Sequence, residues 1–415
     1  MNFLEELEFR GLVKDVTDYE GLKERMKEPM TIYCGFDPTA DSLHVGHMQQ
    51  IILLKRWQNA GHRPLALVGG ATGMIGDPRP TTERKLLTLE ELAHNVECIK
   101  EQLSRFIDFN AQGGAVLVNN YDWLGNLNIL DFLREYGKHF NVSYMLNKDT
   151  VSKRLETGIS FTEFSYTILQ SIDWLNLHQK HNCVGQIGGS DQWGNLTSGS
   201  ELIRKILGPE TKVFGITSPL ITKSDGSKFG KSEGKNIWLD PNRTNAYEFY
   251  QFWINTPDVD VIDYLKRLSF ISVDEILALE KDMQENAHLR NAQKALAADM
   301  TMMCHGEEGL KSAIKISETL FGQDFKSLTY DELKMALGGM NQNPIVSEGN
   351  IVDVLVDNKI CGSKREAREF VNNGSISLNG EKVSDLELMI TKDNALFNEF
   401  TIIRKGKKNY FVLTH

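Results

Sequence analysis

The chain has 415 residues, of which 41% are hydrophobic and 25% are charged. This length is too great for one ordinary hydrophobic core, so two or three domains are expected. The composition is that of a soluble globular protein. With 46 basic and 56 acidic residues the net charge is −10 at pH 7. Chains that coat nucleic acid non-specifically are usually basic, so the overall charge argues weakly against such a role.

The cysteines and the N-terminus indicate the compartment. There are five cysteines, and no two of them have the C-x-x-C spacing. An odd number without that spacing argues against a disulfide framework and a zinc ribbon, and fits a reducing compartment. The acidic N-terminus lacks the pattern of a signal or transit peptide. No stretch approaches the ~20 apolar residues of a membrane span. We therefore predict a cytoplasmic protein without a membrane partner.

Short strands alternate with helices in the first half of the chain. Strands are predicted at residues 31–34, 65–68, 115–118 and 183–187. Helices are predicted at 2–11, from 45 to Gly61, from the Thr88/Glu91 capping box onward, at 129–136, at 161–177 and before Gly208. This alternation predicts a Rossmann-like, doubly wound parallel sheet, in which ligands bind at the carboxyl ends of the strands.

The second half of the chain has a different texture. Residues 245–320 show helical periodicity without clear strands, and the last part resembles a small α+β module. The predicted division is a catalytic domain at 1–221, a loop and connector at 222–244, a helical domain at 245–320, a linker at 321–346 and the module at 347–415.

Two short stretches have the features of a phosphate site. The first, from Tyr33 to His47, reads YCGFDPTADSLHVGH and places two histidines three residues apart near the start of a helix. Helix N-termini attract anions, although two surface histidines beside an ordinary turn would explain this stretch equally well. The second, from Lys228 to Ser232, reads KFGKS and lies in a loop with three glycines and three lysines. A lysine on such a loop can follow phosphate as it leaves.

Together these stretches resemble the two signatures of class I aminoacyl-tRNA synthetases. The second signature is commonly KMSKS, and Phe229-Gly230 is the variant typical of one subgroup. Between the two stretches, a mostly apolar helix carries Tyr166, Gln170 and Asp173 on one face, as expected for a polar-lined pocket. A solvent-facing polar stripe is the structural alternative.

The resemblance becomes close when the glycine-rich turns are included. The segments GGATG at 69–73, GDP at 76–78 and QIGGSDQWGN at 186–195, with the two signatures, are similar to those of bacterial-type tyrosyl-tRNA synthetases. This similarity runs over nearly the whole chain. It implies ATP-dependent activation of L-tyrosine to tyrosyl-adenylate and transfer of the tyrosyl group to tRNA(Tyr), with release of pyrophosphate and AMP.

The resemblance also implies roles for individual residues. The implied tyrosine contacts are Tyr33 and Asp173 at the phenolic hydroxyl, Asp77, Tyr166 and Gln170 at the ammonium group, and Gln192 near the carboxylate. The implied contacts to adenosine and ribose come from Cys34, Gly35, Asp37, His47, Gly189 and Asp191. The implied phosphate contacts come from Thr39, His44, Lys228, Lys231 and Ser232, with Arg84 as the best equivalent of a further phosphate-binding residue and Arg79 or Lys85 as alternatives.

The implied chemistry needs no general base, because the tyrosine carboxylate is itself the nucleophile that attacks the α-phosphate. Catalysis then consists of positioning and charge stabilisation. Mg²⁺ is expected to accompany ATP, without a dedicated metal site in the protein. The resemblance also implies a homodimer with its interface near residues 129–146.

The C-terminal module has a pattern of helix, turn, strand and Asn-Gly hairpin that resembles the RNA-binding module of small-subunit ribosomal protein four. Its candidate RNA-binding residues are Lys364, Arg365, Arg368, Arg404, Lys405, Lys407 and Lys408. A solvated helix is the structural alternative.

Three other functions compete with this interpretation. Tryptophanyl-tRNA synthetase shares the signatures, but an indole has no hydroxyl for Tyr33 and Asp173. A non-catalytic RNA-binding protein on a synthetase scaffold is disfavoured by the intact histidines and lysines of both signatures. A coenzyme nucleotidyltransferase is disfavoured by the length of the chain and by its C-terminal module.

Overall fold

A computed structural model describes residues 1–78, 86–111, 114–224, 229–232, 235–322, 324–338, 340–406 and 409–415. The chain divides into two compact units. The first unit contains Met1–Arg243 and Thr256–Asp299, and the second contains Thr244–Asn255 and Met300–His415. The five-part division expected from the sequence remains a prediction, and the two units are described separately below.

A five-stranded parallel sheet forms the centre of the first unit. Its strands are β1 (Thr31–Phe36), β2 (Arg63–Val68), β3 (Val116–Asn119), β4 (Cys183–Gly189) and β5 (Phe214–Ser218). They lie in the order β3-β2-β1-β4-β5, and every adjacent pair is parallel. The direction of winding therefore reverses between β1 and β4, which is where doubly wound sheets bind ligands. The predicted fold class is confirmed, although β5 was not among the predicted strands.

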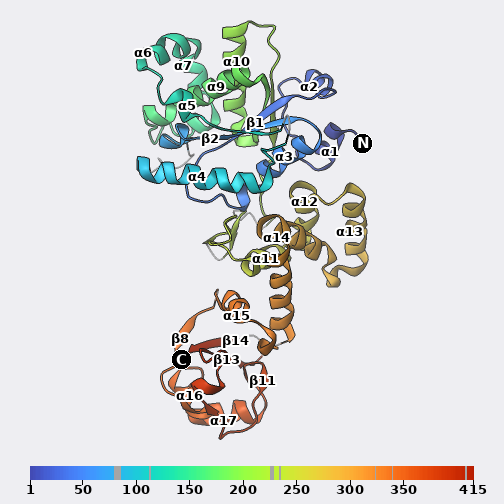
Figure 1. The fold of residues 1–415 in the computed structure, drawn as a ribbon, viewed down its shortest axis with the longest axis vertical. Coiled ribbons are helices and arrows are strands. Elements are labelled where there is room, and N and C mark those ends of the chain that lie inside the picture. Colours follow the sequence, from blue (N-terminus) through green and yellow to red (C-terminus); the bar gives the residue numbers. More distant parts are fainter. Residues whose placement is uncertain are drawn as a thin grey trace. The chain divides into compact units, whose positions relative to one another are not determined.

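Helices cover both faces of this sheet (Figure 1). The helices α3 (Met48–Asn59) and α4 (Leu89–Phe106) pack on one face, and α9 (Phe161–His181) and α10 (Trp193–Leu207) pack on the other. The α4 helix begins at the predicted capping box, in which Thr88 and Glu91 bond reciprocally. Beneath α9 and α10, Tyr33, Leu65 and Trp174 belong to one buried apolar cluster. This cluster fixes the face of the sheet on which α9 presents its polar side chains.

The remaining elements of the first unit are short or lie outside the sheet. They are α1 (Phe3–Phe9), α2 (Tyr19–Arg25), α5 (Tyr121–Leu124), α6 (Ile129–Asp131), α7 (Val142–Leu146), α8 (Asp149–Ser152), α12 (Asp258–Leu268), α13 (Val273–Asn286) and the paired strands β6 (Lys231–Ser232) and β7 (Lys235–Asn236). The single helix predicted over 129–136 is in fact α6 followed by a π-helical turn at Phe132–Tyr136. The long helix α14 (Asn291–Gly322) contributes residues to both units and kinks at Gly306, whose φ is 71°.

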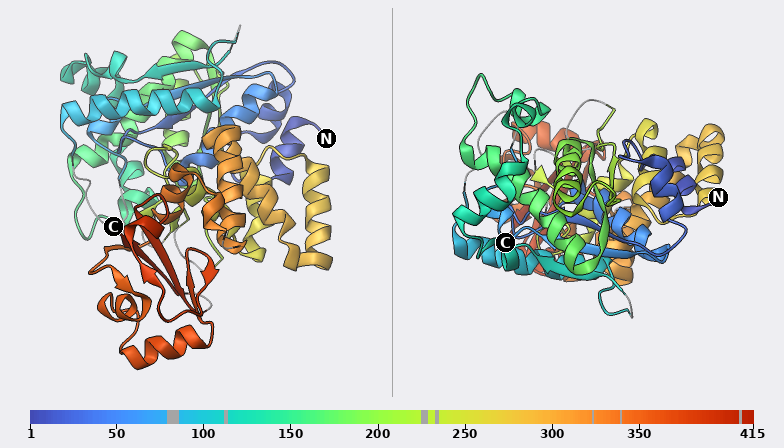
Figure 2. Two further views of the ribbon diagram at one scale, coloured as in Figure 1. Left: turned by 60° about the horizontal axis from the view of Figure 1, so that its bottom comes forward. Right: turned by 90° about the horizontal axis from the view of Figure 1, so that it is seen from above.

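The second unit is built on another five-stranded sheet, drawn in orange to red in Figure 2. Its strand order is β11-β10-β13-β14-β8. Its strands and helices are α11 (Ala246–Ile254), α15 (Tyr330–Leu337), β8 (Gln342–Pro344), β9 (Gly349–Asn350), α16 (Ile351–Asp357), α17 (Lys364–Asn372), β10 (Ile376–Leu378), β11 (Glu381–Lys382), β12 (Met389–Ile390), β13 (Phe400–Lys405) and β14 (Asn409–Thr414). The predicted Asn-Gly hairpin joins β10 to β11, with positive φ at Asn379 and Gly380.

One hydrophobic core of the second unit includes residues from the segment that was expected to be a linker. Leu333 and Leu337 of α15 belong to the same buried cluster as Phe400 and Val412 of the sheet. The strand β8 also pairs with β14. A cut at residue 347 would therefore expose apolar side chains on both sides of the cut.

None of the described helices is long and apolar enough to cross a membrane.

Candidate active site

A cavity of about 330 Å³ opens beside the carboxyl ends of β1 and β4. All six residues with an implied role in tyrosine binding line it: Tyr33, Asp77, Tyr166, Gln170, Asp173 and Gln192. Seven residues with an implied role in ATP binding also line it: Cys34, Gly35, Asp37, Thr39, His47, Gly189 and Asp191. Side chains from widely separated parts of the chain are thus brought together at the point where the sheet reverses its winding.

In the turn after β1, each of the two histidine rings accepts a hydrogen bond from a backbone N–H. The backbone N–H of Gly46 donates to Nδ1 of His44 at 3.0 Å, and the N–H of His44 donates to Nδ1 of His47 at 3.2 Å. The two rings lie 4.2 Å apart between centroids. A Cβ on Gly46 would lie 2.6 Å from the His44 ring, so only glycine allows this approach.

The surroundings of both imidazoles favour their neutral form. Burial and, to a smaller extent, the neighbouring His44 lower the pKa of His47 to about 3. Burial also lowers the pKa of His44, as does the positive charge of Lys231. Because Nδ1 of each ring accepts a backbone N–H, the proton of each neutral ring lies on Nε2. The pair therefore offers hydrogen-bond donors rather than positive charge. Burial also raises the pKa of Cys34 to about 12, so its thiol is not a nucleophile at neutral pH.

The Tyr33 hydroxyl is buried and has no hydrogen-bond partner among the described residues. The side chain extends from β1 toward Trp174 of α9 and is only 1% exposed. A buried hydroxyl without a partner is costly, and such groups commonly mark a position where a ligand supplies the missing bond. Four amide oxygens of residues that line the same cavity are in the same situation within the described part of the chain, those of Gln49, Gln50, Gln170 and Gln186.

The Asp173 carboxylate is held from two sides. Trp123 donates through Nε1 to Oδ1 at 2.8 Å, and Asn120 donates through Nδ2 to Oδ2 at 3.0 Å. Burial raises the pKa of Asp173 to about 7, while these two donors act in the opposite direction. Neither Asn120 nor Trp123 was identified from the sequence. Asn120 follows directly on β3, so the rule that sites lie at the carboxyl ends of strands could have identified it.

A second carboxylate, Asp37, is bonded to two hydroxyls. Tyr166 donates to Oδ2 at 2.9 Å, and Thr72 donates to Oδ1 at 2.7 Å. Asn120 also donates to the Thr72 hydroxyl, at 2.9 Å, which links Asp37 to Asp173 through a continuous chain of hydrogen bonds. In this structure Asp37 therefore bonds to Tyr166, a residue for which the resemblance implies a contact with tyrosine, whereas for Asp37 itself the resemblance implies a contact with adenosine and ribose.

The third carboxylate, Asp77, accepts from two amides that follow β4, one in the short turn at Ser190–Gln192 and one at the start of α10. Gln192 donates at 2.9 Å and Asn195 at 3.3 Å. Burial raises the pKa of Asp77 to about 6, despite the hydrogen bond from Gln192. Gln170 donates to the Gln192 amide oxygen at 3.4 Å. With Asp191, four aspartates thus line a cavity whose described lining contains no lysine or arginine, and a cationic ligand would stabilise their carboxylates.

The second signature lies against the first. Gly230 has a φ of 87°, and a Cβ added to it would lie 3.2 Å from Val45 and 3.4 Å from the backbone nitrogen of Gly46. This explains why the variant with glycine at this position suits the present turn. Lys231 is exposed, and Ser232 lies in β6. Lys228 and Arg84, with the alternatives Arg79 and Lys85, lie outside the described residues.

The candidate RNA-binding residues fall into two groups. Lys364, Arg365 and Arg368 are exposed on α17, where Lys364 pairs with Asp353 at 2.6 Å. By contrast, Lys405 bonds to Glu366 and to the Ile360 carbonyl, both at 2.9 Å, within the module, and Arg404 donates to the Ser377 hydroxyl at 3.1 Å. Lys407 and Lys408 lie outside the described residues. The exposed group on α17 is therefore the better candidate surface.

Comparison with known proteins decides the family. Residues 24–322 match the family model for tRNA synthetases class I (W and Y), and residues 332–413 match the model for a tyrosine–tRNA ligase SYY-like C-terminal domain. Tyrosine–tRNA ligase 1 of Bacillus anthracis is 55% identical over 419 residues, which cover all of both chains. The chain belongs to the tyrosyl-tRNA synthetases. Tyrosine–tRNA ligase of Listeria monocytogenes serovar 1/2a is 52% identical over 421 residues, again with full coverage of both chains.

Solved structures agree with this assignment. A C-terminally truncated mitochondrial tyrosyl-tRNA synthetase of Aspergillus nidulans has a TM-score of 0.69 at 32% identity, covering 77% of this chain and 94% of its own. A tryptophanyl-tRNA synthetase of Plasmodium falciparum, at 14% identity with a TM-score of 0.53, covers 80% of this chain and 87% of its own and shares the fold. The family's reaction is ATP-dependent activation of L-tyrosine to tyrosyl-adenylate and transfer of the tyrosyl group to tRNA(Tyr). The sequence-based prediction of this function is confirmed.

Proposed function

We propose that the cavity beside β1 and β4 binds tyrosine with its phenol at Tyr33 and Asp173 and its ammonium group at Asp77, Tyr166 and Gln170, with Gln192 near its carboxylate. The observation that carries this proposal is the unpartnered Tyr33 hydroxyl beside the Asp173 carboxylate, in the part of the chain that the structure describes. The substrate hydroxyl would donate to the carboxylate and accept from Tyr33. Phenylalanine would leave the buried Tyr33 hydroxyl unpaired and would give the Asp173 carboxylate no donor besides Trp123 and Asn120. Tyrosyl-tRNA synthetases are themselves the usual example of such rejection.

The carboxylates of the cavity also suit the other end of the substrate. Burial raises the pKa of Asp77 to about 6, and a positive ammonium group would favour its ionised form. Below pH 6, binding of tyrosine should therefore release a proton from this group. Calorimetric titrations of tyrosine at pH 5.5 in buffers of different ionisation enthalpy would measure this release, and buffer-independent heats would contradict the assignment.

ATP would lie on the side of the H-x-G-H turn. The proposed contacts with adenosine and ribose come from Cys34, Gly35, Asp37, His47, Gly189 and Asp191. The phosphates would be bound by Thr39, His44, Lys228, Lys231, Ser232 and Arg84. His44 would donate a hydrogen bond through Nε2. The tyrosine carboxylate attacks the α-phosphate and pyrophosphate leaves, so the protein contributes orientation and charge stabilisation.

Mg²⁺ would enter with ATP. Among the described residues no group of three or more histidine, cysteine, aspartate or glutamate side chains is arranged to hold a metal ion. The metal would then be held mainly by the phosphates and water, as Mg²⁺ commonly is. Its place in this mechanism is that of a substrate component.

ATP–pyrophosphate exchange with each amino acid in turn tests the tyrosine pocket. Tyrosine should support exchange. Exchange driven by tryptophan, or by no amino acid, would overturn the proposal. Gln170→Ala should raise the KM for tyrosine more than the KM for ATP, since its amide is assigned to the amino-acid side. The matched control is Gln58→Ala at the far end of α3, outside the cavity, which should change neither KM.

For tRNA, we propose that the exposed basic face of α17 contacts the phosphate backbone. Arg365→Glu combined with Arg368→Glu should raise the KM for tRNA(Tyr) and leave tyrosine-dependent exchange unchanged. A charge-reversal control away from α17 is Lys281→Glu on α13, which should alter neither reaction. Substitution is preferable to deletion of 347–415 here, because the core of the second unit includes residues on both sides of that boundary.

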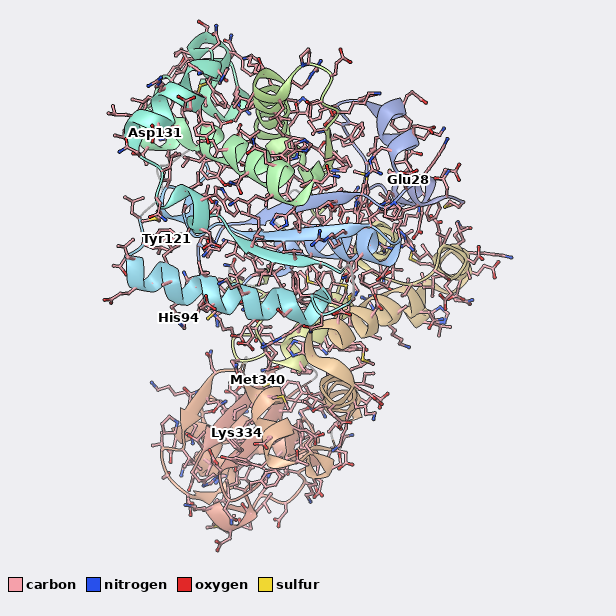
Figure 3. The ribbon with its side chains drawn as sticks, turned by 45° about the horizontal axis from the view of Figure 1, so that its top comes forward. Glu28, His94, Tyr121, Asp131, Lys334 and Met340 are labelled. Carbon is pink, nitrogen blue, oxygen red and sulfur yellow. The ribbon has the colours of Figure 1, made fainter. Side chains whose placement is uncertain are left out.

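We also propose that the protein is a homodimer working in the cytoplasm. The segment from Ile129 to Tyr144 exposes several large apolar side chains, with Ile129 63%, Leu130 70% and Val142 60% exposed. Tyr121 and Asp131 mark this side of the first unit in Figure 3. Clustered apolar exposure of this kind commonly marks a protein interface. Leu130→Asp should produce monomers in sedimentation velocity, and an unchanged dimer would place the interface elsewhere. No disulfide joins any of the five cysteines, as is usual in a reducing compartment.

A further inference from the structure

The described residues of the second signature loop rest on α12, a helix that has no assigned part in the reaction. Two of its side chains, Asp260 and Tyr264, are one helical turn apart and so share a face. Both are buried, at 7% and 3% exposure. They contact the loop on both sides of its undescribed part.

The first contact is polar and lies at the beginning of the loop. The Asp260 Oδ2 atom accepts from the Ser224 hydroxyl at 3.1 Å and from the Ser224 backbone N–H at 3.4 Å. The Tyr264 hydroxyl donates to the carbonyl oxygen of Thr222 at 3.3 Å. Two backbone positions before the signature are thus fixed to α12.

The second contact is apolar and lies within the signature itself. The Phe229 ring meets the Tyr264 ring edge-on, with centroids 5.2 Å apart and planes at 70°. The next residue, Gly230, accepts from the N–H of Ile237 at 3.0 Å and lies against Val45 of the first signature. Phe229 and Gly230 therefore connect α12 to the H-x-G-H turn, directly before Lys231.

The two sides of the loop are also joined to each other. Lys223 donates through Nζ to the carbonyl oxygen of Lys231 at 3.3 Å. The backbone of Lys231 is consequently held through Lys223 and through Phe229 and Gly230. One side chain, that of Tyr264, supports both routes, since its ring contacts Phe229 and its hydroxyl binds Thr222.

We propose that Asp260 and Tyr264 are positioning residues that set the location of Lys231 during tyrosine activation. The inference rests on the proposed role of Lys231 at the departing phosphates. A lysine acts on phosphate as a point charge, so its effect depends on its distance from the developing charge. In catalysis a misplacement of about 1 Å costs up to about 100-fold in rate. The α12 contacts should therefore affect the chemical step and leave tyrosine binding unchanged.

The test is the single-turnover rate of tyrosyl-adenylate formation at saturating ATP and tyrosine, measured together with the Kd for tyrosine. Asp260→Ala and Tyr264→Leu should each lower the rate by about tenfold or more and change the Kd by less than about twofold. Tyr264→Phe keeps the ring and should recover most of the rate. Val259→Ala, on the same helix at a position that is 75% exposed, should match the parent protein.

Two further variants separate the possible failures. Ser224→Ala removes the hydroxyl bond to Asp260 from the loop, so it should fold and should lower the rate by a few fold, non-additively with Asp260→Ala. Lys231→Ala tests the underlying role, and an unchanged rate in this variant would refute the proposed function of the loop. If Lys231→Ala is slow but Asp260→Ala and Tyr264→Leu are normal, the inference alone is wrong. A Kd for tyrosine that weakens in step with the rate would also overturn it, because α12 would then support the fold in general.

Discussion

Replacement of Tyr33 by phenylalanine should change stability and specificity in opposite directions. In the free protein the hydroxyl is buried and has no partner among the described residues. Leaving a buried polar group unsatisfied costs about 1–3 kcal/mol. Removing only that oxygen creates little empty space, so the free energy of unfolding should stay the same or increase by up to about 3 kcal/mol.

The cost of Tyr33→Phe should appear when tyrosine binds. A hydrogen bond between uncharged groups contributes about 0.5–1.5 kcal/mol net. This corresponds to a loss of about 2- to 13-fold in kcat/KM for tyrosine. For phenylalanine, which cannot use the bond, kcat/KM should stay the same or rise, because the variant no longer buries an unpaired hydroxyl against the bare ring.

Two measurements check this prediction. ATP–pyrophosphate exchange gives kcat/KM for tyrosine and for phenylalanine, and urea unfolding followed by far-ultraviolet circular dichroism gives the stability. An unchanged ratio of the two kcat/KM values would show that the Tyr33 hydroxyl does not contact the substrate phenol. A loss of stability above about 1 kcal/mol would show that the hydroxyl already has a partner in the free protein.

Three further changes follow from the polar groups around the cavity. Trp123→Phe removes a donor that stabilises the Asp173 carboxylate, so the pKa of Asp173, which burial raises to about 7, should rise further. The acid limb of kcat/KM for tyrosine should then move to higher pH, and an unmoved limb would count against the contact. Since the folded pKa of Asp173 lies above its ordinary value of 3.8, its contribution to stability is fully present below pH 3.8 and is lost as pH rises toward 7. As the pH rises from 3.8 to 7, the melting temperature of Asp173→Asn should therefore increase relative to that of the parent protein. Above pH 7 the difference between the two melting temperatures should stay constant. Lys148→Met removes charged hydrogen bonds to the Thr167 and Ser198 hydroxyls, at 2.7 and 2.6 Å, that join α9 to α10. It should lower the free energy of unfolding by about 2–3 kcal/mol in urea, and an unchanged midpoint would contradict this estimate.

Much of the site could be predicted because its residues lie in local motifs. The H-x-G-H turn, the glycine-rich turns and the polar face of α9 depend on spacing within a few residues, and each follows a strand or lies on one helix. The rule that ligands bind at the carboxyl ends of parallel strands then places these segments at one edge of the sheet. This rule, together with the resemblance to the synthetase family, assigned Tyr33, Asp77 and Asp173 to one pocket before their distances were known.

The residues that hold the site in place could not be read in this way. Trp123 and Asn120 bond to Asp173 across 50 and 53 positions of sequence, and α12 meets the signature loop from another distant segment of the chain. Such partners depend on which elements the fold brings side by side. The spacing of residues within one segment does not predict its contacts with distant segments. The same holds for the packing partners of α15 and β8, two elements that lie within the segment expected to be a linker. Packing places α15 in the core of the second unit and pairs β8 with its sheet.

The sequence alone therefore indicated the chemistry of this protein, because its two signatures resemble those of class I aminoacyl-tRNA synthetases and its polar helix face fits an amino-acid pocket. Only the tertiary structure decided the state of those groups. Burial lowers the pKa values of the two histidines and raises those of Asp77 and Asp173, and it leaves the Tyr33 hydroxyl without a partner among the described residues. The physical reason is that protonation and hydrogen-bond satisfaction depend on the loss of water around a group, and that loss is set by packing between distant segments.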